Sequence, residues 1–188
     1  MAQAEANSVS PTVRSASPED LPAILAIYND AVLTTTATAD YAPSSLEARV
    51  KWYEERMQLG LPVFAAETEG QVIGWSALSP YHARIGYRFT AEVSIYIAAE
   101  RRGQGIGKQL LLPLIEAGNE LGLHVLIASI DSENEASIRL HAANGFVKCG
   151  ELHEVYTKFG RWLGVVYMEL RLSKHSAPPM PYETTLSA

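Results

Sequence analysis

The residues best suited to chemistry lie in a glycine-rich stretch, residues 101–108, with the sequence RRGQGIGK. It follows a β-branched, aromatic stretch, residues 92–98, and precedes an apolar helical pattern, so it is expected to be a strand-to-helix turn. Glycines at this place let several backbone N–H groups converge at the start of a helix, which makes an anion site. Arg101, Arg102 and Lys108 add positive charge. The stretch therefore predicts a site for a phosphate-bearing ligand.

Two common phosphate-binding patterns do not fit this stretch. The dinucleotide pattern GxGxxG fails at Lys108, and the NTPase pattern GxxxxGK[ST] fails because Gln109 follows the lysine. The pattern (Gln/Arg)-x-x-Gly-x-(Gly/Ala) fits residues 102–107 and resembles the pyrophosphate loop of the GNAT acetyltransferases, although an ordinary glycine-containing turn would also fit it. A second block, Asn134-x-x-Ser137 at the start of a helix, resembles the part of that family in which an Asn faces the pantetheine arm. The two blocks together favour the resemblance.

Further segments resemble the phosphinothricin acetyltransferase-like branch of the GNAT family, and the resemblance extends from about Val13 to Leu172. It implies acetyl-CoA as co-substrate. Members of this branch usually form homodimers, and they acetylate the α-amine of phosphinothricin, methionine sulfoximine, methionine sulfone or related amino acids. The segments are residues 27–29 (IYN), 87–97 (YRFTAEVSIYI), 137–141 (SIRLH) and 158–162 (KFGRW).

The resemblance implies a set of residues that bind acetyl-CoA. The backbone of the strand should pair with the pantetheine amides as an added strand would, and a nearby N–H should polarise the thioester carbonyl. The expected cofactor-binding residues are Ile95, Ile97, Arg102, Gly103, Gln104, Gly105, Ile106, Gly107, Lys108, Asn134 and Ser137.

Acetyl transfer to an amine also needs a base for the ammonium and a proton for the leaving thiolate. Glu92 begins an otherwise apolar strand and matches the acid that the branch is thought to use as general base, although an isolated Glu would be a solvated carboxylate. His141 stands where many members of the family carry a tyrosine proposed to protonate the thiolate. Its expected role is general acid or hydrogen-bonding partner, and the sequence leaves both open.

Residues 81–87 (YHARIGY) resemble the substrate loop of the branch. Arg84 is expected to bind an oxyanion of the substrate, because its planar guanidinium can do so bidentately, although it could also be a solvated loop residue. Tyr87 and Thr90 are expected to line the same pocket with Glu92. Many relatives carry Arg or Lys in place of His82, so the preferred substrate stays open.

Residues 158–162 are expected to reach over the substrate pocket, from the same chain or from a dimer partner. After Trp162, relatives often show Leu-Asp where this chain has Leu163 and Gly164. Any role of that Asp is therefore absent here.

The surrounding pattern predicts the elements that must hold these residues. The order of strands and helices indicates an α/β protein with the GNAT fold, a mixed central β-sheet of about six or seven strands flanked by about four helices. The acetyltransferase domain is expected at residues 12–172, between tails at 1–11 and 173–188. Strands are expected at residues 12–16, 62–67, 72–78, 92–98, 124–130, 145–150 and 165–172, and helices from Ser17, from Ser44 or Ser45, after the glycine-rich turn, and at 134–143.

Composition excludes several classes of function. A formal net charge of −6 argues against general binding of nucleic acid, which needs a surplus of Lys and Arg. No apolar run approaches the length of a membrane span and residues 1–11 lack signal-peptide features, so no membrane is expected as partner and a cytoplasmic location is predicted. The scattered histidines and single cysteine, Cys149, predict neither a metal site nor a disulfide.

Two other functions compete with small-molecule acetylation. One is a GNAT-fold acetyltransferase acting on protein N-termini or lysines, which would need an open, extended groove. The other is a non-catalytic acyl-CoA-binding module, which could dispense with Glu92. Arg84 and its short aromatic loop favour a small anionic substrate, and the presence of both Glu92 and His141 argues against the binding module.

Overall fold

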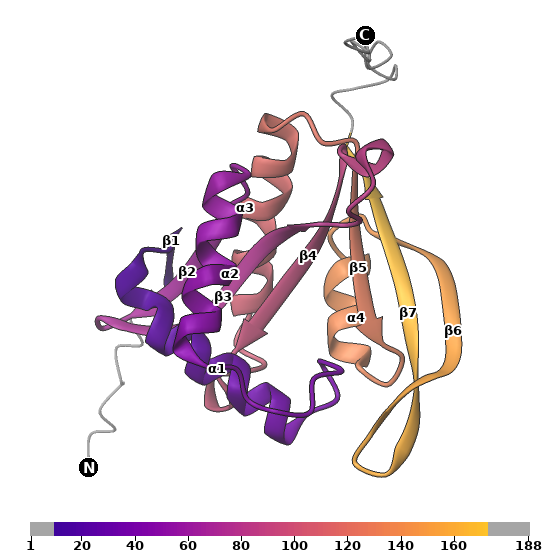
Figure 1. The fold of residues 1–188 in the computed structure, drawn as a ribbon, viewed down its shortest axis with the longest axis horizontal. Coiled ribbons are helices and arrows are strands. Elements are labelled where there is room, and N and C mark those ends of the chain that lie inside the picture. The colour runs from indigo at the N-terminus through magenta and orange to yellow at the C-terminus, as the bar shows by residue number, and fades with distance from the viewer. Residues whose placement is uncertain (1–9, 173–188) are drawn as a thin grey trace, which may run out of the picture.

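A computed structural model describes residues 10–172, which form one seven-stranded sheet in the order β1-β2-β3-β4-β5-β7-β6 (Figure 1). The predicted tails lie outside the described residues, except for Ser10 and Pro11. β4 and β5 are parallel, and all other neighbouring strands are antiparallel. The strands are β1 (Thr12–Ser15), β2 (Val63–Thr68), β3 (Gln71–Pro80), β4 (Thr90–Ile97), β5 (Val125–Asp131), β6 (Val147–Lys158) and β7 (Arg161–Arg171).

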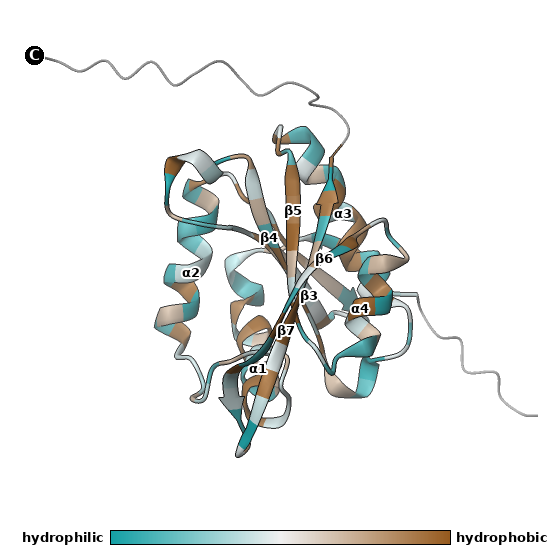
Figure 2. Ribbon diagram, turned by 90° about the vertical axis from the view of Figure 1, so that its right-hand side faces the viewer, coloured by the Kyte–Doolittle hydropathy of each residue, from teal (hydrophilic) through white to brown (hydrophobic). Residues whose placement is uncertain are grey.

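Four α-helices cover the two faces of the sheet within the described chain, so the predicted α/β class and mixed sheet are confirmed. Figure 2 shows α1 and α2 on one side of the sheet and α3 and α4 on the other. α1 packs on β3 and β4, α3 on β2 to β4, and α4 on β5 and β6. The helices are α1 (Leu21–Thr34), α2 (Leu46–Gln58), α3 (Ile106–Glu120) and α4 (Glu135–Ala142), and three short 3-10 turns are η1 (Pro18–Asp20), η2 (Ile85–Tyr87) and η3 (Ala99–Arg101).

Helices α2 and α4 begin at polar residues whose side chains accept a hydrogen bond from a backbone N–H of the first turn. The Ser45 hydroxyl accepts a hydrogen bond from Ala48 N at 3.1 Å, and the Asn134 side chain accepts one from Ser137 N at 3.1 Å. Ser17 precedes the turn η1, which runs directly into α1, and its backbone N–H donates to the Asp20 carboxylate at 2.8 Å. These starts lie where the sequence predicts them.

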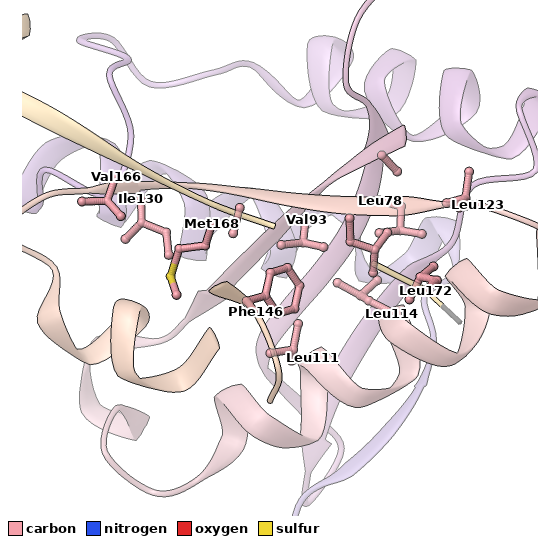
Figure 3. Packing of buried hydrophobic residues seen from close by; sticks show 13 residues of the cluster. Leu78, Val93, Leu111, Leu114, Leu123, Ile130, Phe146, Val166, Met168 and Leu172 are labelled. Carbon is pink, nitrogen blue, oxygen red and sulfur yellow. The ribbon is translucent and has the colours of Figure 1, made fainter. Parts of the chain in front are cut away.

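The main hydrophobic core lies between α3 and the sheet (Figure 3). Leu111 and Leu114 of α3 are fully buried against Leu78 and Val93, and Phe146 closes the space beside them. Each side chain of this kind contributes about 1.5–3 kcal/mol when it leaves water. This packing holds α3, and with it the glycine-rich turn at its start, in a fixed position against β4.

The last two strands are longer than predicted. β6 continues past Gly150 to Lys158, and β7 begins at Arg161 rather than Val165. Residues 151–158 (ELHEVYTK) lack a regular apolar alternation because β6 is an outer strand with a bulge, at which Glu154 has φ +54°. Residues 158–162, expected to reach over the pocket, are the end of β6, the Phe159–Gly160 turn and the start of β7.

Candidate active site

The centre of the sheet opens where β4 and β5 separate. The two strands pair only from Thr90 to Glu92, opposite residues 125–127, and then diverge, as Figure 1 shows. A cavity of about 370 Å³ lies at this divergence. Its wall includes α4 on one face of the sheet and residues 36–39, which follow α1, on the other face. The cavity therefore touches both faces of the sheet.

Five of the predicted site residues line this cavity: Glu92, Ile95, Asn134, Ser137 and His141. They come from β4 and α4, which are separated in sequence by the whole of α3 and β5. The structure therefore brings together the proposed base, the proposed acid or partner and part of the proposed cofactor site.

Other predicted residues lie outside the cavity wall. Arg84, just before the turn η2, and Tyr87, its last residue, are both exposed. Thr90 is half-buried at the start of β4. The His82 and Tyr87 rings lie 4.9 Å apart, and Arg84 N donates to His82 Nδ1 at 3.0 Å. These contacts give the loop a defined shape beside the end of β4 at which Glu92 lies.

The alternation of β4 decides which groups face which side. Val93 and Ile95 pack with α3, whereas Tyr96 stacks on Trp75 at 4.8 Å within the cluster that contains α1. Glu92 shares the side of Tyr96, because side chains two and four apart on a strand face the same way. The Glu92 carboxylate is therefore on the α1–α2 side, whereas His141 belongs to α4 on the opposite side.

The glycine-rich turn starts α3 with two left-handed residues, Gly103 at φ +75° and Gly105 at φ +81°. A residue with a side chain adopts this backbone conformation only at a steric cost, so glycine is favoured at both positions. Gly107 serves packing instead, because a Cβ there would come within 2.9 Å of Leu140 Cδ2 on α4. The first turn of α3 carries backbone N–H groups that have no partner within the helix, as at any helix start.

Arg102 is engaged by the protein itself. Its Nε donates to the carbonyl of Ile97 at 3.1 Å, and a guanidinium nitrogen lies 3.6 Å from an Asp30 carboxylate oxygen. The side chain thus ties the turn to the end of β4 and to α1. Lys108, in contrast, is exposed on the first turn of α3.

His141 is buried, with 4% of its surface exposed. Its Nδ1 lies 2.8 Å from the carbonyl oxygen of Ser137, and since a carbonyl only accepts, Nδ1 carries a proton. Burial lowers the pKa of His141, which favours the neutral ring. Nε2 is then an unprotonated acceptor, and it is buried without a partner among residues 10–172. Its ring stands edge-on to Phe146 at 5.0 Å.

Comparison with known proteins assigns the fold to a family. The family model described as "Acetyltransferase (GNAT) domain" matches residues 12–147. The chain belongs to the GNAT acetyltransferase family. A Salmonella typhimurium L-methionine sulfoximine/L-methionine sulfone acetyltransferase is 41% identical over 167 residues, which cover 89% of this chain and 98% of the relative.

Two solved structures extend the comparison. A phosphinothricin acetyltransferase from Sinorhizobium meliloti in complex with acetyl-CoA is 36% identical with a TM-score of 0.88, covering 95% of this chain and 97% of that chain. A ribosomal-protein-alanine N-acetyltransferase from Brucella melitensis is 47% identical with a TM-score of 0.84, covering 86% and 99%. This GNAT chain is thus similar to proteins named for both small-molecule and protein substrates.

Several cavity residues of this GNAT domain were missed by the sequence reasoning. They are Thr36, Thr38, Ser94, Asp131 and Tyr156. The threonines lie in a stretch without periodicity, TTTATAD, which gives no signal for a site. Asp131 had a readable signal, because it is an acid at the end of a buried strand.

Neither a metal cluster nor a membrane span is found in the described part of this domain. No group of three or more His, Cys, Asp or Glu side chains within residues 10–172 is arranged to hold a metal ion. No helix of those residues is both long and apolar enough to cross a bilayer.

Proposed function

We propose that this GNAT acetyltransferase transfers the acetyl group of acetyl-CoA directly to the α-amine of a small amino-acid-like substrate, such as methionine sulfoximine, methionine sulfone or phosphinothricin. One observation carries the proposal: the cavity between β4 and β5 touches both faces of the sheet, with Glu92 on the α1–α2 side and α4 on the other. Two substrates can therefore meet there from opposite sides, as direct transfer requires.

The acetyl-CoA side is supported by the turn and by the edge of β4. Beyond Glu92, β4 no longer pairs with β5, so the backbone of Ile95 and Ile97 can pair with the pantetheine amides. The pyrophosphate would bind at the start of α3, on the N–H groups of residues 103–107 and beside Lys108. Asn134 uses its amide oxygen to cap α4, which leaves its NH₂ group for the pantetheine arm, next to Ser137.

The reaction follows from these positions. Glu92 accepts a proton from the substrate ammonium, directly or through water, and the free amine attacks the thioester carbonyl carbon. The carbonyl oxygen gains negative charge, which a backbone N–H of β4 stabilises, and then the C–S bond breaks. The new amide keeps the acetyl group, and the sulfur leaves as a thiolate that takes up, through water, the second proton lost by the nitrogen. Glu92 releases the first proton to solvent and is ready for the next turnover.

For His141 we favour the role of hydrogen-bonding partner over that of general acid. Nδ1 holds its proton on the Ser137 carbonyl, so Nε2 has a proton to give only when the ring is cationic, and burial opposes that state. Nε2 therefore acts as an acceptor on the acetyl-CoA side of the cavity.

On the substrate side, Arg84, Tyr87 and Thr90 are proposed to contact the far end of the acceptor. Their loop adjoins the end of β4 that carries Glu92, and the Arg84 guanidinium is exposed and suits a phosphinate or sulfonyl oxygen. These residues would act on the part of the substrate that extends out of the cavity.

Acetylation of protein N-termini is the second candidate function. It is favoured by the similarity to the structure named ribosomal-protein-alanine N-acetyltransferase. The small cavity and the crossing of residues 36–39 over it favour the small substrate. A non-catalytic acyl-CoA-binding role is disfavoured because Glu92 lies in the cavity wall.

We also propose that the chain forms a homodimer. The α1–α2 side of β5, β7 and β6 carries none of the helices of residues 10–172, and β6 exposes Val147, Leu152 and Val155 by 60%, 46% and 48%. Exposed apolar groups along one strand are typical of an interface. The net charge of −6 supports the expectation that nucleic acid is not a partner.

A thiol-release assay tests the proposed function. Acetyl-CoA is offered with phosphinothricin, methionine sulfoximine, methionine sulfone, common amino acids and an alanine-initiated peptide, with Glu92→Gln beside wild type. We expect turnover of at least one small acceptor and a fall of about a hundredfold in kcat/KM in the variant, since a positioned base contributes that much or more.

Glu116→Gln, an exposed change on α3, is the matched control and should leave turnover unchanged. Turnover of the peptide alone would replace the proposed substrate class. Acetyl-CoA binding without turnover of any acceptor would favour the binding module.

A further inference from the structure

Residues 36–39, which we call the crossing segment, pass from the end of α1 to the far side of the cavity. They leave the helix layer over β3 and β4 and reach β5 and β6, where Thr36, Ala37, Thr38 and Ala39 all line the cavity wall. In Figure 1 the chain after α1 runs toward the diverging ends of β4 and β5. The segment belongs to no helix or strand, so its position depends on side-chain contacts.

Three side chains from the other half of the sheet hold the crossing segment. The Thr36 hydroxyl donates to the Asp131 carboxylate at the end of β5. The Tyr156 hydroxyl donates to the Thr36 carbonyl at 3.0 Å, and the Lys158 ammonium donates to the Thr38 carbonyl at 2.8 Å. These contacts connect residues about a hundred positions apart or more in the chain.

The holding side chains are themselves fixed. Asp131 and Lys158 are 7% and 2% exposed, and the Asp131 carboxylate also accepts a hydrogen bond from Glu133 N at 3.2 Å. Burial and the adjacent Asp131 raise the pKa of Tyr156 to about 12, so its hydroxyl keeps the proton that it donates. Burial lowers the pKa of Lys158. A buried polar group of this kind is costly to leave unpaired, which makes these contacts persistent.

The hydrogen bonds also determine what the segment can offer a ligand. The carbonyls of Thr36 and Thr38 are occupied, and Tyr96 approaches that of Ala37 at 3.5 Å. The Ala37 N–H donates to the Thr35 hydroxyl at 3.2 Å, so the N–H groups of Thr36, Thr38 and Ala39 remain for a ligand, and the Lys158 ammonium is bound to the Thr38 carbonyl beside them. Such a wall suits an anion, whereas Glu92 elsewhere in the cavity suits the ammonium.

We propose that the crossing segment binds the carboxylate of an amino-acid acceptor, and that Asp131, Tyr156 and Lys158 are positioning residues that set acceptor affinity by holding it. The inference rests on the proposed function, and it assigns these residues a role that does not touch the reacting atoms. Arg84 would then meet a phosphinate or sulfonyl oxygen in the side chain of the acceptor rather than its α-carboxylate.

Steady-state kinetics of Thr36→Val and Tyr156→Phe test the proposal. Each change removes one hydroxyl with little change of shape. Thr34→Val is the matched control, because it removes a hydroxyl at the end of α1 whose hydrogen bond is to the Asp30 carbonyl and not to the crossing segment. We expect the KM for methionine sulfone to rise about tenfold in the first two variants. The kcat, the Kd of acetyl-CoA measured by calorimetry, and all constants of Thr34→Val should stay within about twofold of wild type.

A second acceptor separates the carboxylate from a general loss of order. With the α-carboxamide of methionine sulfone, the same variants should change KM by less than about threefold, because the anion is absent. Equal losses for acid and carboxamide, an unchanged KM for both, or a parallel loss of acetyl-CoA affinity would each overturn the proposal. Lys158→Met should resemble Tyr156→Phe, which covers the case in which one variant fails to fold.

Amide hydrogen exchange of residues 36–39 distinguishes a failure of this proposal from a failure of the proposed function. If wild type acetylates no amino acid, the proposed function fails and with it the carboxylate assignment. The contacts that hold the crossing segment are then tested by hydrogen exchange alone. Faster exchange of the segment's amides in Thr36→Val and Tyr156→Phe than in Thr34→Val supports these contacts. Unchanged exchange overturns them.

Discussion

At the scale of single residues, the burial of His141 has a thermodynamic consequence that does not depend on any substrate. The folded protein holds the ring neutral with Nδ1 on the Ser137 carbonyl, whereas the unfolded chain exposes an ordinary imidazole with a pKa near 6.5. As pH falls below about 6.5, the unfolded chain binds a proton that the folded protein binds less readily. Stability is therefore lost on acidification through that range.

We predict that His141→Phe weakens this dependence on pH. Phenylalanine keeps an aromatic ring against Phe146 but has no group to protonate. Between pH 7.5 and 5.5, the free energy of unfolding of wild type should fall by about 1 kcal/mol more than that of the variant, within the limit of 1.36 kcal/mol per pH unit for one proton. Denaturant titrations at the two pH values measure it.

His153→Asn is the matched control, because His153 has an exposed side chain on β6. It should retain the full dependence of wild type on pH. The same slope in His141→Phe as in wild type would contradict the assignment of a neutral, buried His141.

At the scale of elements, the close contact between β6 and β7 depends on a glycine. A Cβ at Gly164 would lie 2.7 Å from the carbonyl oxygen of Leu152 and 2.9 Å from the Ser132 hydroxyl. The first of these neighbours is backbone and cannot move without disturbing the strand pair. Glycine at this position therefore allows β6 and β7 to approach closely.

We predict that Gly164→Ala lowers the free energy of unfolding by about 1–3 kcal/mol, the usual cost of forcing extra atoms into a packed site. Gly150→Ala on β6 is the matched control, because a Cβ there meets nothing within 4 Å, and its effect should stay within about 0.5 kcal/mol. Thermal or denaturant unfolding measures both. Equal stability of the two variants would show that the strands can separate at no cost.

The sequence predicted those elements whose signals are local. The glycines of residues 103–107, the caps at Ser45 and Asn134 and the strand that carries Glu92 each follow a short pattern, and all lie where they were expected. The crossing segment was missed because its position depends on contacts such as Thr36 with Asp131, 95 residues apart. The full length of β6 was missed because an outer, bulged strand lacks regular alternation.

At the scale of the whole molecule, the face of the sheet beside the cavity bears on assembly. On the face of the sheet that α1 and α2 occupy, no helix of the described residues covers β5, β7 and β6. On β6, apolar side chains are exposed. We predict a mass in solution of about twice 20.5 kDa, the mass of one chain. Light scattering after size exclusion measures it.

Leu152→Glu should shift the protein toward the mass of one chain, because it places a charge among the exposed apolar groups of β6. His153→Glu is its neighbour on the strand and serves as the control, since its side chain is already polar and exposed. A single-chain mass for wild type, or equal behaviour of the two variants, would contradict the proposed homodimer.

The two outer strands of the sheet also oppose one kind of association, the edge-to-edge pairing of strands from different copies of the chain. An unpaired strand edge can template the addition of another chain and so begin aggregation. β1, at one edge, has only four residues. β6, at the other, is twelve residues long, but it carries Lys148, Glu151 and Glu154 and is broken by the bulge at Glu154. A continuous sheet from one copy to the next is therefore disfavoured at both ends, and the chain is protected from growing into fibres by its own edges.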